Sequence, residues 1–177
     1  TFYGFGDDRK PDDIDNIWKL FEAAITLAND DNVENRAEFS RWYDIVHDQY
    51  CIRWNITMGL YWIRPYVYIN LDSRNRWYIS EGGDIAKKMS SEILKLVNEK
   101  NNNLPSASQY LYIRDYCSEM LSSGNYDVKN FPELSCKAWI VSEEVNREIA
   151  AAKTKKTSSA AFLRWFGPLL QALRDLG

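Results

Sequence analysis

Apolar residues recur along most of this chain at spacings of three and four residues, which is the period of an amphipathic α-helix. Five such stripes predict helices over residues 14–28, 39–50, 85–97, 110–121 and 162–173. The first stripe is Ile14, Trp18, Phe21, Ile25 and Ala28, the second is Phe39, Trp42, Val46 and Tyr50, and the third is Ile85, Met89, Ile93 and Leu96. A further helix is expected to start at Pro132–Glu133 and to run to Ala152.

A different pattern occupies the segment between the second and third stripes. Residues 58–63 are apolar on every side, which predicts a buried helix that Arg64–Pro65 ends. Residues 66–69 mix β-branched and aromatic types and predict a short extended segment or a tight turn. Asp72 is expected to cap a short helix that runs to Ile79. The predicted fold class is therefore mainly α: a multi-helix globular domain with at most a short strand or extended segment near 66–69.

Composition shifts suggest three parts. The double glycine Gly82–Gly83 predicts a boundary between an N-terminal helical subdomain, residues 1–82, and a second helical subdomain, residues 83–152. Residues 153–177 are expected to form a basic linker and a final helix that Gly167–Pro168 interrupts. Because residue 1 is Thr rather than Met, the chain is expected to be a piece of a longer protein.

Charge, cysteine content and hydropathy each argue against certain classes of protein for this chain. Residues 1–50 hold 5 Lys or Arg against 12 Asp or Glu, a net charge of −7, so a polyanion should avoid this third of the chain. The three cysteines lack C-x-x-C spacing, which argues against a disulfide framework and against a zinc site. No apolar run approaches the roughly 18–20 residues of a membrane span, and the expected location is the cytoplasm.

Complete catalytic motifs are missing from the sequence. It has no G-x-x-x-x-G-K-[ST] loop, and its one histidine, His47, is expected at the surface or rim of an acidic helix. Asp127-Val128-Lys129 has the D-x-K spacing of metal-dependent nucleases, but it follows a Ser-Gly-Asn turn, which favours a chance match. We therefore expect no enzymatic activity in this chain, no cofactor, no metal ion and no small-molecule substrate.

Three segments resemble parts of restriction proteins. The run Leu60-Tyr61-Trp62-Ile63-Arg64-Pro65 with Leu71-Asp72-Ser73-Arg74-Asn75-Arg76 resembles a segment in the N-terminal, non-motor part of McrB-like proteins, the AAA+ GTPase subunits of modification-dependent (type IV) restriction systems. Phe131-Pro132-Glu133-Leu134-Ser135 with Ala138-Trp139 resembles a second marker of these proteins. Residues 162–174 are similar to the first helix of the winged-helix module that opens Mrr-type restriction proteins.

This resemblance implies a role in host defence without a catalytic residue set. It implies a domain that recognises or positions DNA, including methylated DNA, ahead of the GTPase motor domain of the parent chain and a McrC-like nuclease subunit. The alternative is a protein-interaction or assembly module of the same complex. A distant third is a helix-hairpin-helix glycosylase, because Asp72 precedes an Arg-x-Arg helix as the catalytic aspartate of those enzymes does. The upstream glycine hairpin of those enzymes is absent, since residues 51–57 contain no glycine.

If DNA binds, basic and aromatic side chains of the middle and C-terminal regions should contact it, through phosphates and base stacking. The candidates are Arg64, Arg74, Arg76, Trp77, Tyr78, Lys87, Lys88, Lys153, Lys155 and Lys156. The competing interpretation is a core hairpin in which Asp72 is only a structural cap and pairs with an arginine.

Overall fold

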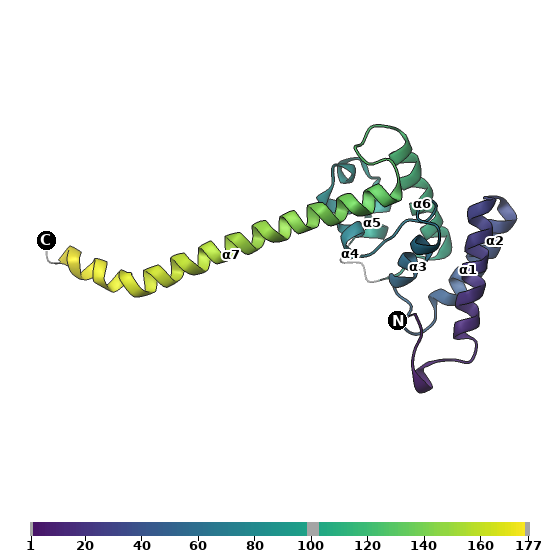
Figure 1. The fold of residues 1–177 in the computed structure, drawn as a ribbon, viewed down its shortest axis with the longest axis horizontal. Coiled ribbons are helices and arrows are strands. Elements are labelled where there is room, and N and C mark those ends of the chain that lie inside the picture. Colours follow the sequence, from purple (N-terminus) through teal and green to yellow (C-terminus); the bar gives the residue numbers. More distant parts are fainter. Residues whose placement is uncertain (1, 99–102, 176–177) are drawn as a thin grey trace. The chain divides into compact units, whose positions relative to one another are not determined.

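The computed structural model describes residues 2–98 and 103–175, with side chains as far as residue 154 (Figure 1). All regular secondary structure in these ranges is helical, which confirms the mainly α fold class. The chain divides into two units, Thr1–Trp139 and Ile140–Gly177. The two subdomains expected on either side of Gly82–Gly83 both begin within the first unit.

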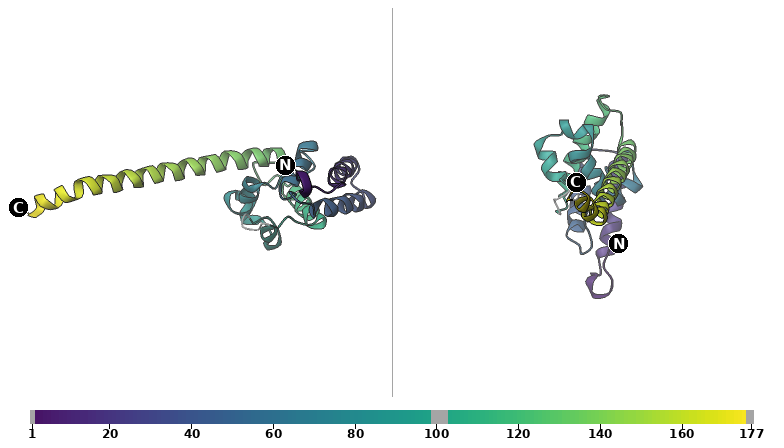
Figure 2. Two further views of the ribbon diagram at one scale, coloured as in Figure 1. Left: turned by 90° about the horizontal axis from the view of Figure 1, so that it is seen from below. Right: turned by 90° about the vertical axis from the view of Figure 1, so that its left-hand side faces the viewer.

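The first unit is built from short and medium helices and three single turns. Its helices are α1 (Asp13–Asn29), α2 (Val33–His47), α3 (Asn55–Ile63), α4 (Ser73–Trp77), α5 (Ser91–Val97), α6 (Ala107–Ser122) and the start of α7 (Phe131–Asp175). The turns are η1 (Gly6–Asp8), η2 (Tyr78–Gly82) and η3 (Asp84–Lys88). Helices α1 and α2 pack as a hairpin, with α3 against α1 and α6 against α2 (Figures 1 and 2).

Four stacked aromatic rings form the centre of this unit. Phe39 and Tyr43 of α2 lie against Tyr68 and against Tyr110 of α6, with ring centroids 5.7 Å apart for Phe39–Tyr68 and 5.4 Å apart for Tyr43–Tyr110. The hydroxyl of Tyr68 donates to the carbonyl of Ala24 at 2.6 Å, and that of Tyr110 donates to the carbonyl of Ile69 at 3.1 Å. Both bonds satisfy phenol groups that burial would otherwise penalise. The cluster thus joins α1, α2, α6 and residues 68–69.

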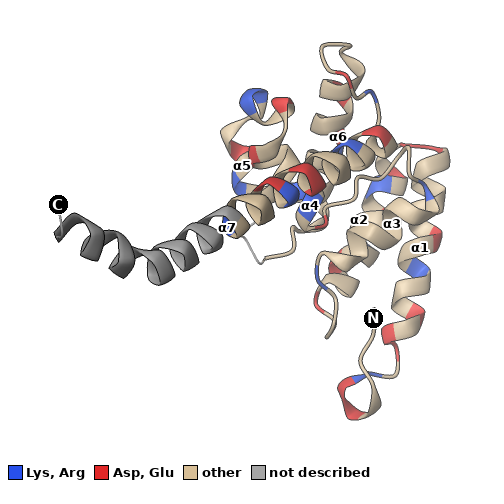
Figure 3. Cartoon of the chain, turned by 60° about the vertical axis from the view of Figure 1, so that its left-hand side comes forward, with Lys and Arg blue, Asp and Glu red and all other residues tan. Residues whose placement is uncertain are grey.

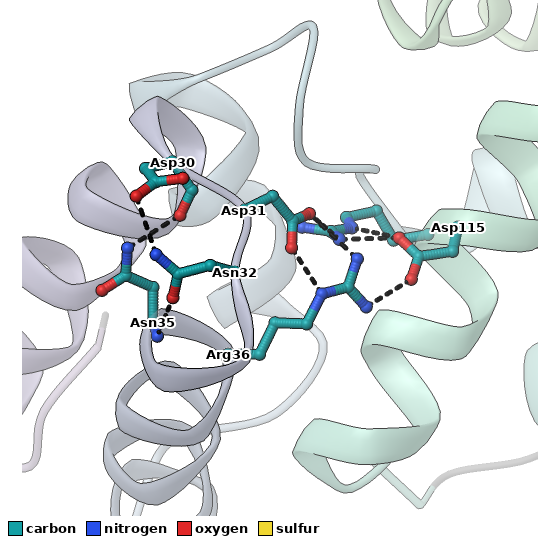
Figure 4. A network of polar contacts seen from close by, with 7 residues as sticks. Asp30, Asp31, Asn32, Asn35, Arg36 and Asp115 are labelled. Carbon is teal, nitrogen blue, oxygen red and sulfur yellow. Dashed lines mark hydrogen bonds and ion pairs between the residues drawn. The ribbon is translucent and has the colours of Figure 1, made fainter.

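A ring of ion pairs fastens the α1–α2 connection to α6 (Figure 4). Arg36 donates to both Asp31 and Asp115, and Arg114 donates to Asp31 at 2.7 Å and to Asp115 at 2.8 Å. The Arg114 side chain is only 4% exposed, so pairing with two carboxylates offsets its desolvation. Burial alone would raise the pKa of Asp31, but the hydrogen bonds and charges of both arginines outweigh it and lower that pKa.

The apolar stripe that α1 buries is not the one named from the sequence. The side chains that α1 buries are Ile17, Leu20, Ala23, Ala24 and Leu27. Trp18 is 63% exposed, and Ile14, Phe21, Ile25 and Ala28 are only half-buried. The helix carries two adjacent apolar stripes, and periodicity alone does not say which one the rest of the domain covers. In α2 the same holds on a smaller scale, since Tyr43 is buried while Trp42 is half-buried and Tyr50 lies exposed beyond the helix end.

One further expectation, a continuous helix over residues 85–97, needed correction. The single helix predicted over 85–97 is divided into η3 and α5, because Met89 is extended and the Ser90 side chain accepts a hydrogen bond from the Ile93 N–H as a new N-cap. Of the two alternatives for residues 66–69, the structure has the turn, in which the N–H groups of Val67 and Tyr68 both donate to the carbonyl of Arg64.

The second unit is helical where the structure describes it. Residues 153–159, expected as a linker, are part of α7, and so are Gly167–Pro168. The linker segment contains no glycine or proline, and the Thr154 hydroxyl donates to the carbonyl of Ala150 one turn earlier. A polar, basic composition is therefore compatible with a helix.

Candidate functional site

The segment from α3 to α4 is organised by side chains that bind backbone groups. Asp72 is the N-cap of α4 and accepts from the Asn75 N–H at 2.9 Å, which confirms the capping geometry expected from the sequence. The Thr57 hydroxyl of α3 accepts from the Leu71 N–H at 3.0 Å. These bonds fix the turn between the two helices, and they engage Asp72 in a structural role.

The three arginines expected to contact phosphates are not gathered on one exposed surface. Arg76 is 6% exposed, with its guanidinium carbon 4.1 Å from the centre of the Trp54 ring and a hydrogen bond from Nη1 to the carbonyl of Asn98. Arg64 is half-buried and donates to the carbonyl of Ile63 at 2.8 Å. Arg74 is half-buried on α4. Arg76 therefore packs as a core side chain, in which a cation–π contact replaces water.

The two aromatic candidates of this segment differ in what they face. Trp77 covers Gly82 so closely that a Cβ there would lie 2.4 Å from its ring, so the ring is part of the packing. Tyr78 is only 6% exposed and lines a cavity. Burial and the nearby carboxylates of Asp84 and Asp127 raise the pKa of this phenol. Tyr78 thus stays protonated near neutral pH.

A cavity of about 150 Å³ lies beside Tyr78. We call it the Tyr78 pocket; its lining is Tyr78, Asp84, Ile85, Asn125, Tyr126, Asp127, Val128 and Lys137. Lys87 pairs with Asp84 at 3.3 Å, and the Lys88 ammonium lies 5.3 Å from the centre of the Tyr126 ring. The fold therefore brings Tyr78, Lys87 and Lys88 to one place, together with an amide, a second tyrosine and a third lysine.

The charges around this pocket are mixed. Lys87, Lys88 and Lys137 are exposed ammonium groups that can bind phosphate oxygens, whereas Asp84 and Asp127 can accept from amino groups. Figure 3 likewise shows basic and acidic residues interspersed along the helices of the first unit. Groups that bind anions and groups that accept from amino groups thus lie close together at this pocket.

The D-x-K spacing does not build a nuclease centre. Asp127 lines the Tyr78 pocket, whereas Lys129 lines a separate cavity of about 120 Å³ beside Tyr66 and Phe131. Within residues 2–98 and 103–154, no three His, Cys, Asp or Glu side chains are placed to hold a metal ion. The three cysteines are free thiols, and burial raises the pKa of Cys117 to about 12.

The last group of candidates lies in the second unit. Lys153 is exposed on α7, while the side chains of Lys155 and Lys156 fall outside the described residues. Among the helices that the structure describes, none combines the length and the apolar character of a bilayer span.

Sequence reasoning missed two features of the first unit. His47 bridges elements, with Nδ1 2.7 Å from Asp48 Oδ1 and Nε2 3.0 Å from the carbonyl of Leu104. Its isolated position in the sequence gave no signal, because Leu104 is far along the chain. The exposed aromatic side chains of α1 and α3 were the second feature, and the signal was present as a second apolar stripe in α1.

Comparisons with known proteins agree with the division into units. Residues 1–141 match the family described as "Domain of unknown function (DUF8425)", and the first unit ends at Trp139. No curated protein and no solved structure matches the chain. Because the match spans most of the 177 residues, this chain belongs to the DUF8425 family.

Proposed function

We propose that this chain is a non-catalytic domain that binds and positions DNA, including methylated DNA, within a McrB-like restriction protein. The resemblance of residues 60–76 and 131–139 to the non-motor part of such proteins supports the cellular role. The observation that carries DNA binding is the position of three lysines: Lys137 lines the Tyr78 pocket, and Lys87 and Lys88 contact its lining residues Asp84 and Tyr126.

The pocket supplies both kinds of contact that a nucleic-acid site uses. Ammonium groups bind backbone phosphates and set the position of the protein, while amide and carboxylate groups bond base edges. Here the three lysines fill the first role. Asn125 and Asp127 fill the second, since a carboxylate accepts from an exocyclic amino group such as that of cytosine. Tyr126 is half-buried and offers part of its ring for stacking.

The test is the salt dependence of DNA binding. We expect the full chain to bind a labelled duplex, measured by fluorescence anisotropy between about 50 and about 200 mM salt, with affinity that falls as salt rises. Replacing Lys87, Lys88 and Lys137 together by Ala should weaken binding and reduce the salt slope by about 3, roughly one per lost phosphate contact. Comparing the affinities for methylated and unmodified duplexes then tests whether the domain recognises methylation.

The matched control replaces three basic residues in the acidic N-terminal third of the chain by Ala, namely Arg9, Lys10 and Lys19. This variant has the same net charge as the first triple variant, but the salt slope of its DNA binding should stay nearly unchanged. Equal effects of the two triple variants would point to a general charge effect and refute the site. Absence of any binding by the folded wild-type chain would refute the function.

A protein-interaction module is the second candidate, and one specific observation favours it. Several aromatic side chains of the first unit are exposed away from the Tyr78 pocket, among them Trp18, Trp62 and Phe5. Exposed aromatic clusters are typical of docking surfaces between proteins.

A further inference from the structure

Aromatic side chains from three segments meet around Gly59 of α3. A Cβ at Gly59 would lie 3.2 Å from Phe21 Cζ and 3.3 Å from Phe2 Cε1, so both rings lie directly over this glycine. Trp18 packs edge-on against Phe21, with ring centroids 6.4 Å apart. Trp62 is three residues after Gly59, a spacing that places it on the same side of α3. We call Phe2, Trp18, Phe21 and Trp62 the aromatic face.

This face is largely open to solvent. Trp18 is 63% exposed and Trp62 is 65% exposed, and Phe5 of the adjoining N-terminal segment is 70% exposed. The half-buried Ile14 and Ile25 extend it along α1. Leaving two tryptophans in water forgoes a large gain from burial, which is the usual signature of a surface that a partner covers.

The charge around the aromatic face is acidic. Asp15 and Glu22 lie three residues before and four residues after Trp18, on the same side of α1, and both are exposed. Lys19 is the one base of α1, and its ammonium lies 4.7 Å from the centre of the Trp42 ring on α2, beside a cavity that Glu22 also lines. Carboxylates so placed repel nucleic acid and anionic lipid, and they attract a cationic partner.

We propose that the aromatic face docks a basic amphipathic helix of a partner protein. The apolar side of that helix packs on the aromatic rings and on Ile14 and Ile25, over a stretch of α1 about 17 Å long, or three helical turns. Its lysines or arginines reach Asp15 and Glu22 and lie over the indole rings of Trp18 and Trp62 as cation–π contacts. DNA binding at the Tyr78 pocket is not required for this interaction.

Two synthetic peptides of 18 residues test the proposal. One is a helical Leu–Lys peptide with its leucines on one face, and the other is its Leu–Glu counterpart; fluorescence anisotropy of each labelled peptide against the full chain gives the affinity. We expect the Leu–Lys peptide to bind and the Leu–Glu peptide to bind at least about 10-fold more weakly. Trp18→Ala with Trp62→Ala should lower the affinity for Leu–Lys at least about 10-fold, whereas Trp139→Ala, at an exposed tryptophan of α7, should leave it unchanged.

A charge reversal separates docking on this face from general stickiness. Asp15→Lys with Glu22→Lys should invert the preference, so that the Leu–Glu peptide binds more tightly than the Leu–Lys peptide. Circular dichroism checks that each variant is folded.

Equal affinity for the two peptides, or binding that the two tryptophan substitutions leave unchanged, would overturn the proposal. Stronger binding of DNA or of anionic vesicles at this face would overturn it as well. Because the Lys87, Lys88 and Lys137 triple variant retains the aromatic face, it should bind the peptide normally even if it no longer binds DNA.

Discussion

Two groups of aromatic residues lie in the same small unit and have opposite surroundings. Phe39, Tyr43, Tyr68 and Tyr110 are at most 1% exposed and stack against one another. On the aromatic face, by contrast, Trp18 and Trp62 are more than half exposed. The first group has neighbours on every side, and two of its hydroxyls are bonded to carbonyls of distant segments. The high aromatic content of the chain therefore serves two purposes, stability inside and recognition outside.

The comparison predicts that substitutions in the buried aromatic cluster lower the free energy of unfolding the most. Phe39→Ala removes a fully buried ring and leaves a cavity between α2, Tyr68 and Tyr110, so it should lower the free energy of unfolding by about 3–5 kcal/mol. Urea denaturation followed by circular dichroism measures this. A loss below about 1 kcal/mol would show that the cluster is not the stabilising centre of the unit.

The hydroxyls of the cluster allow a finer test. Tyr68→Phe removes the bond to the carbonyl of Ala24 and should cost about 1 kcal/mol. The Tyr43 hydroxyl is buried without a hydrogen-bond partner in the structure, so Tyr43→Phe should be neutral or slightly stabilising. The same denaturation experiment compares the two. Equal losses would mean that the Tyr43 hydroxyl has a partner after all, such as a buried water molecule.

His47 links the helix that carries Phe39 and Tyr43 to Leu104, three residues before the start of α6, and its effect on stability should depend on pH. Burial lowers the pKa of His47, but the bonds to Asp48 and to the carbonyl of Leu104, with the charges of Asp48 and Asp44, outweigh it and raise the pKa above the ordinary value near 6.5. The protonated ring donates to both acceptors. Its contribution is therefore complete below about pH 6.5 and is lost as pH rises through the raised folded-state pKa.

A pH series measures this contribution. The free energy of unfolding of the wild type minus that of His47→Gln should shrink between about pH 6 and about pH 9. Glutamine can donate to only one of the two acceptors at a time and does not titrate, so its own contribution is constant. A difference that stays flat or grows with pH would contradict the assignment.

The smallest effect on stability is expected from substitutions on the exposed aromatic face. Trp18→Ala and Trp62→Ala remove mostly exposed rings, so each should change the free energy of unfolding by no more than about 0.5 kcal/mol. The same substitutions should nevertheless weaken docking of a basic helix. A loss of stability comparable to that of Phe39→Ala would show that the aromatic face is structural, and the contrast between the two groups would fail.

Local features of the chain could be predicted because their causes are local. The helices of residues 13–29 and 107–122 follow from apolar residues at a period near 3.6, and the N-cap at Asp72 follows from its own side chain and the next three residues. Of the candidate site residues, Lys87 and Lys88 are exposed, as expected for two adjacent charged side chains. The break at Met89–Ser90 was also local, but a continuous apolar stripe concealed it.

The sequence by itself determined a helical chain, the N-cap at Asp72 and an acidic N-terminal third. Only the tertiary structure decided that Ile17 and Leu20 face the core while Trp18 faces water, that Arg76 is buried against Trp54, and that Tyr78 shares a pocket with Tyr126 and Lys137. The physical reason is distance along the chain. Helix period and capping depend on residues within one or two turns, whereas burial, ion pairing and pocket formation depend on which remote segment packs against a given side of the helix.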